Sequence, residues 1–166
     1  MKTNKLAGGG ITAALCTLMI LLASVVPNIK LSLLFASSIV MAICLLRYRI
    51  STYLISFFAV SLLSLFIAPN KFMPLVFFAF FGNYPLVKLY IEKIKNIYLE
   101  YFVKFIAANI YLFIIYIVLK ALGEASFFDF SMVVLYIAGI FLMLFYDLAF
   151  SFIINAFYKT YYKHLK

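Results

Sequence analysis

The sequence predicts an all-α integral membrane protein, a bundle of six transmembrane helices with both termini in the cytoplasm. Of its 166 residues, 68% are hydrophobic and 11% are charged, whereas about 25% of the residues of an ordinary soluble domain are charged. A water-soluble chain of this length has too much surface to hide so many apolar side chains. The composition therefore excludes soluble enzymes, secreted disulfide scaffolds and nucleic-acid readers.

Six apolar stretches are predicted to cross the membrane. A helix needs about 20 residues to span the hydrocarbon layer. Helices satisfy their own backbone hydrogen bonds in lipid, and the stretches lack the two-residue alternation of a β-barrel. The second stretch is short, and we expect it to gain length from Lys30, whose long side chain reaches the headgroups. The predicted spans cover residues 6–26, 31–46, 51–68, 72–91, 102–122 and 131–152.

Short turns separate these spans and leave no room for a soluble domain. Proline, asparagine, glycine and charged residues mark the turns, which are placed at residues 27–28, 47–50, 69–70, 93–96 and 123–126. The whole chain, residues 1–166, is therefore predicted to form a single transmembrane helical domain.

The basic residues predict on which side of the membrane the chain begins and ends. With six spans, 11 of the 14 lysines and arginines fall on the side of the two termini, and only Lys30, Lys71 and Lys120 fall on the other. Basic residues collect in cytoplasmic loops, so both termini of this multi-pass protein of the cell membrane are predicted to be cytoplasmic. The net charge of +9 then reflects orientation and contact with the lipid bilayer, and predicts no nucleic-acid partner.

The first span carries a row of small side chains. When each residue advances the helix by about 100°, Gly10, Ala13, Ala14 and Thr17 fall on one face. Small residues let helix backbones approach closely in lipid, where hydrophobic attraction between helices is weak. Two interpretations remain open: this face packs within the bundle, or it docks onto another membrane protein.

The fourth span is predicted to be kinked. Pro85 has no N–H to donate, so the carbonyl of Phe81 is expected to lose its helical partner. Asn83 lies beside the kink and offers a polar side chain in place of that partner. Such a kink either shapes the bundle or forms part of a ligand site.

Polar side chains in the outer half of the fifth and sixth spans suggest a small-molecule pocket. Tyr116 and Lys120 share one face of the fifth span, and Tyr136 lies at the same level of the sixth. These three residues are predicted to border the pocket. The alternative is that the tyrosines only anchor the helices at the membrane interface.

Asp147 is the one acidic residue inside a predicted span. Because an ionised carboxylate that faces lipid is costly, we expect Asp147 to face the bundle. Its predicted charge partner is Lys104 or Lys88, and its predicted hydrogen-bond partner is Asn83 or Asn109. This buried polar cluster is either a clamp that holds helices together or a proton or ion relay.

The sequence contains no recognisable catalytic or metal-binding pattern. Its one histidine, His164, lies in the C-terminal tail, so a histidine-based triad or zinc site has no basis. Cys16 and Cys44 lie inside apolar stretches without metal-ligand spacing. We therefore expect no enzyme, no metal site and no cofactor.

Three features of the N-terminal half carry a family resemblance. They are the small-residue opening of the first span at residues 6–15 (LAGGGITAAL), the turn at Pro27, and the turn at residues 47–51 into the third span. With six helices and short loops, the chain resembles the membrane-embedded S component of an energy-coupling factor (ECF) transporter.

In that family, the small face of the first helix docks on a transmembrane T component driven by two ATPases. The substrate is held in the outer half of the S component. The resemblance implies that Gly10 and Ala14 are docking residues of an uptake transporter, and that Tyr116, Lys120 and Tyr136 border its substrate pocket. The competing interpretation is an accessory or assembly subunit that transports nothing and packs against a larger membrane complex.

Overall fold

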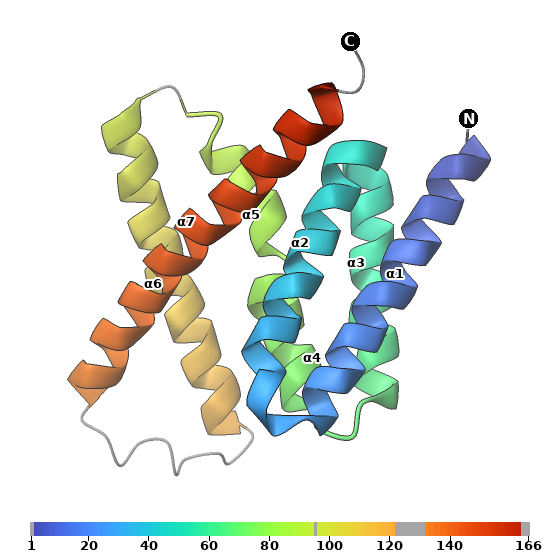
Figure 1. Cartoon of the computed structure of the whole chain (residues 1–166). Helices are drawn as coiled ribbons and strands as arrows, with labels where there is room; N and C mark the ends of the chain where they lie inside the picture. The colour runs from blue at the N-terminus through green and yellow to red at the C-terminus, as the bar shows by residue number, and fades with distance from the viewer. Residues whose placement is uncertain (1, 95, 122–131, 164–166) are drawn as a thin grey trace. The chain divides into compact units, whose positions relative to one another are not determined.

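The computed structural model describes residues 2–94, 96–121 and 132–163, and within these ranges every regular element is a helix. The helices are α1 (Lys2–Val25), α2 (Lys30–Tyr48), α3 (Ile50–Ile67), α4 (Phe72–Val76), α5 (Tyr84–Ile91), α6 (Ile97–Ala121) and α7 (Met132–Lys163) (Figure 1). Among the described residues, six helical segments are long and apolar enough to cross a membrane. The prediction of an all-helical chain with six helices long and apolar enough to span a membrane is confirmed. The predicted turn at residues 123–126 and His164 lie outside the described residues.

The chain divides into two compact units. The N-terminal unit, Met1–Val103, contains α1 to α5 and the beginning of α6, and the C-terminal unit, Lys104–Lys166, contains the rest of α6 and α7. The last helix is longer than the predicted span of residues 131–152 because it continues to Lys163. At 1.5 Å per residue, its 32 residues exceed the roughly 20 that a bilayer requires.

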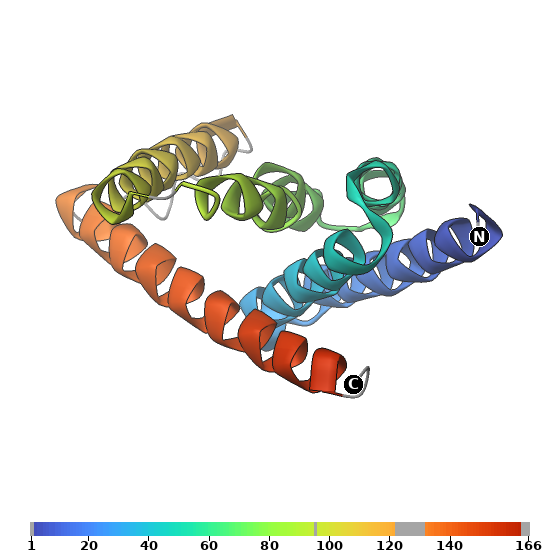
Figure 2. The ribbon, with the colours of Figure 1, turned by 90° about the horizontal axis from the view of Figure 1, so that it is seen from above.

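Close contact between small residues holds the N-terminal unit together. Helix α1 packs against α2, α3 and α4 (Figures 1 and 2). The hydroxyl of Ser56 on α3 donates to the carbonyl of Gly9 at 3.0 Å, and a Cβ atom on Gly9 would lie 2.8 Å from Cγ2 of Thr52. Only glycine at this position allows α1 and α3 to approach so closely.

The fourth span is interrupted, as its sequence predicts. Helix α4 continues into a π-helical turn, Phe77–Phe81, and α5 begins after it at Tyr84. Pro85 lies in the first turn of α5, where the missing N–H is tolerated. The N–H of Leu86 donates to Asn83 at 3.1 Å rather than to Gly82, four residues earlier. The carbonyl of Gly82 is therefore open to a partner from another helix.

Tyr53 on α3 supplies that partner, through a hydrogen bond from its hydroxyl to the Gly82 carbonyl. The Tyr53 ring is buried and stacks on Phe57 with a centroid separation of 6.4 Å. The side chain that caps the helix break thus comes from 29 residues away, and not from Asn83 beside it.

Replacing Tyr53 by phenylalanine should lower the free energy of unfolding by about 1–2 kcal/mol. The ring stays in place, but the buried Gly82 carbonyl loses its donor. Thermal unfolding in a mild detergent measures the change. The control is Tyr98→Phe, because the Tyr98 side chain is 87% exposed. An equal effect of both substitutions would contradict the role given to the Tyr53 hydroxyl.

Candidate functional site

Small residues line two edges of helix α1. Only one of these edges, the filled edge, packs against other helices of the N-terminal unit. Ala13 and Thr17 are 9% and 7% exposed, inside the core of the N-terminal unit. Gly10 and Ala14 are exposed. A Cβ atom on Gly10 would have no atom of another described segment within 4 Å. Of the four predicted docking residues, the structure leaves only Gly10 and Ala14 accessible.

The filled edge also buries side-chain hydroxyls, which sequence analysis did not single out. Thr12 and Ser61 bond carbonyls one turn earlier in their own helices, at 2.9 and 2.8 Å, and Ser56 bonds α1. No clear signal in the sequence marked them, because the buried serines of α3 are five and three residues apart, which is not a regular helical spacing. These serines are Ser56, Ser61 and Ser64.

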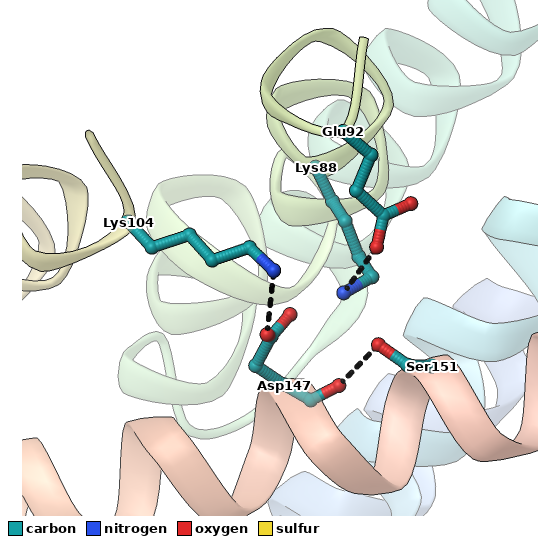
Figure 3. A network of polar contacts seen from close by, with 5 residues as sticks. All are labelled: Lys88, Glu92, Lys104, Asp147 and Ser151. Carbon is teal, nitrogen blue, oxygen red and sulfur yellow. Dashed lines mark hydrogen bonds and ion pairs between the residues drawn. The ribbon is translucent and has the colours of Figure 1, made fainter. Parts of the chain in front are cut away.

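The C-terminal unit contains the ion pair predicted for Asp147. Nζ of Lys104 on α6 lies 3.2 Å from Oδ2 of Asp147 on α7, and the two side chains are 20% and 18% exposed (Figure 3). One turn further along α7, the hydroxyl of Ser151 donates to the Asp147 carbonyl at 2.8 Å. Of the two lysines that the sequence offered as partners, the structure pairs Lys104 with Asp147.

Lys88 of α5, the other candidate, forms an ion pair with Glu92, the residue that follows the last residue of this helix. Its Nζ lies 2.9 Å from Oε1 of Glu92, and the lysine is 5% exposed whereas the glutamate is 46% exposed (Figure 3). The ammonium also lies 6.0 Å from the centre of the Tyr84 ring. The spacing of four residues is the local signal that predicts this pair.

A hydrogen bond also joins a residue of the predicted pocket to a residue of the predicted polar cluster. The hydroxyl of Tyr136 on α7 donates to Oδ1 of Asn109 on α6. On α6, Tyr116 is half-buried and Lys120 is exposed. Asn83 belongs to the N-terminal unit, at the break before α5. Tyr136–Asn109 and Asp147–Lys104 therefore both link α6 to α7.

The described residues contain no group of three or more histidine, cysteine or acidic side chains arranged to hold a metal ion. The thiols of Cys16 and Cys44 are free and buried, in the core between α1, α2 and α3. The thiol of Cys16 lies 3.5 Å from the Ser37 carbonyl of α2. Both cysteines act as small core residues in the described structure.

No protein-family model matches the chain, and no curated protein or solved structure is significantly similar to it. A function for the chain is therefore inferred from its own residues and their geometry.

Proposed function

We propose that the chain is a substrate-binding membrane subunit of an uptake transporter for a small molecule, similar to the S component of an ECF transporter. The observation that carries the proposal is the open small-residue edge of α1, at Gly10 and Ala14. Through this edge, α1 docks onto a transmembrane T component, which two ATPases drive.

The two edges of α1 support docking because they have the same chemistry but different surroundings. Gly9 and Ala13 are four residues apart and face the interior of the N-terminal unit, where a Cβ on Gly9 would meet α3. Gly10 and Ala14 have the same spacing one residue further on and remain exposed. In lipid, a surface that lets backbones approach closely favours another helix over mobile acyl chains.

Orientation and substrate binding complete the proposal. Both termini lie in the cytoplasm, because 11 of the 14 basic residues fall on their side of six spans. A reporter that works only outside the cell should give no signal when fused to Lys166. The small-molecule substrate binds in the outer half, bordered by Tyr116, Lys120 and Tyr136, whose hydroxyl, ammonium and aromatic groups suit a polar ligand.

Gentle purification of the tagged protein from its native membrane tests this function. The preparation is expected to contain a second membrane protein, to hydrolyse ATP and to release a small molecule on denaturation. A partner that comes without ATPase activity and without any small molecule would contradict the transporter and favour the accessory subunit.

A further inference from the structure

Two exposed arginines flank the end of α2. Arg47 lies in its last turn, and Arg49 alone connects α2 to α3. The connection is tight, because Arg49 has a φ of 82°. Lys5 lies on α1, one turn before the Gly8 that meets the end of α2. Three basic residues therefore gather where α1, α2 and α3 meet.

Helices α1 to α4 contribute no carboxylate to this turn. The first carboxylate in the sequence is Glu92, so α1, α2, α3 and α4 carry none. Glu92 itself forms an ion pair with Lys88. These four helices therefore give the α2–α3 turn a net positive charge.

The turn is also held in a fixed position by Tyr48. A Cβ atom on Gly8 would lie 2.6 Å from Cε2 of the Tyr48 ring, so the ring occupies the space that glycine leaves on α1. The guanidinium carbon of Arg47 lies 5.5 Å from the centre of the same ring. Contact with the aromatic face orients a guanidinium while its edge stays able to donate hydrogen bonds.

We propose that Arg47, Arg49 and Lys5 form a binding site for the phosphate of an anionic phospholipid, with Tyr48 and Gly8 holding Arg47 in place. The site lies at the ends of membrane-spanning helices, where headgroups are found. Guanidinium groups bind phosphate oxygens through paired, charge-assisted hydrogen bonds. A site built in this way recognises a negatively charged headgroup better than a zwitterionic one.

The test compares phosphatidylglycerol with phosphatidylcholine. The full-length protein is reconstituted in nanodiscs that contain both lipids. The protein is then released from the nanodiscs, and native mass spectrometry counts the lipids of each kind that remain bound to it. The wild type should retain phosphatidylglycerol preferentially. Each basic residue at the membrane surface contributes about fivefold, so the double substitution Arg47→Gln and Arg49→Gln should lower that preference about twenty-five-fold.

Two matched controls separate a built site from diffuse attraction. Lys30→Gln with Lys71→Gln removes the same charge from the opposite end of the unit and should preserve the preference. Gly8→Ala keeps every charge but displaces Tyr48, and should lower the preference, whereas Gly10→Ala should not, because its Cβ has space. Equal loss in both double variants, or full retention in Gly8→Ala, would overturn the proposal. So would competition by soluble glycerol phosphate as strong as that by the lipid.

Discussion

Replacing Asp147 by leucine should destabilise the protein by about 3 kcal/mol, at the lower end of the range for breaking a buried ion pair. The substitution leaves the ammonium of Lys104, which is 20% exposed, without its partner at 3.2 Å. In hydrocarbon, a charge that loses its ion-pair partner is costly. The free energy of unfolding, measured by denaturant titration in mixed micelles, gives the size of the effect.

Two companion variants identify its cause. Asp147→Asn keeps a hydrogen-bond acceptor and should cost less than the leucine. Replacing both partners, as Lys104→Met with Asp147→Leu, should recover most of the loss, since well-packed apolar residues often substitute for a buried pair at little cost. If the double variant is as unstable as Asp147→Leu, the stranded lysine is not the cause. Loss of substrate uptake in a fully folded Asp147→Asn protein would favour the relay over the clamp.

Replacing Gly9 by valine should destabilise the N-terminal unit by about 2–3 kcal/mol. Its Cβ would lie 2.8 Å from Cγ2 of Thr52 and 3.1 Å from Oγ of Ser56, so α1 and α3 must separate. Separation also weakens the hydrogen bond from Ser56 to the Gly9 carbonyl. The effect is measured as a fall in the thermal unfolding temperature of the purified protein.

Gly10→Val is the matched control for this substitution. It makes the same chemical change one residue further along α1, where a Cβ has no neighbour from another described segment within 4 Å. Its stability should stay within about 1 kcal/mol of the wild type, because the cost of a β-branched residue and the gain from removing glycine nearly cancel. Equal destabilisation by the two valines would mean that the edges of α1 are not distinct.

Composition and span length predicted the helical class and the number of spans, because crossing a bilayer imposes a length that apolar stretches reveal directly. They did not predict which edge of α1 is filled. Gly8, Gly9 and Gly10 follow one another, so small residues occur all round this end of the helix and periodicity does not select a face. The two glycines differ only in that Gly9 contacts α3 and Gly10 does not.

Among the polar contacts, too, the sequence predicted some and missed others. Asp147 was expected to pair with a lysine because burial of a lone carboxylate is costly, and Lys104 fulfils that expectation. The bond from Tyr53 to Gly82 was missed, because it joins residues 29 positions apart and tyrosine is common in apolar spans for other reasons. Long-range pairs of this kind depend on how the helices pack, which a single sequence does not encode locally.

Comparison of Ala13→Leu with Ala14→Leu tests the docking function most directly. The two alanines are neighbours, but Ala13 is buried in the N-terminal unit and Ala14 is exposed. Ala13→Leu should lower thermal stability. Ala14→Leu should leave the stability of the isolated protein unchanged and abolish co-purification of the ATP-hydrolysing partner, while Ser32→Leu, at an exposed position of α2, retains it. If Ala14→Leu keeps the partner, or loses stability as Ala13→Leu does, α1 does not dock through its open edge.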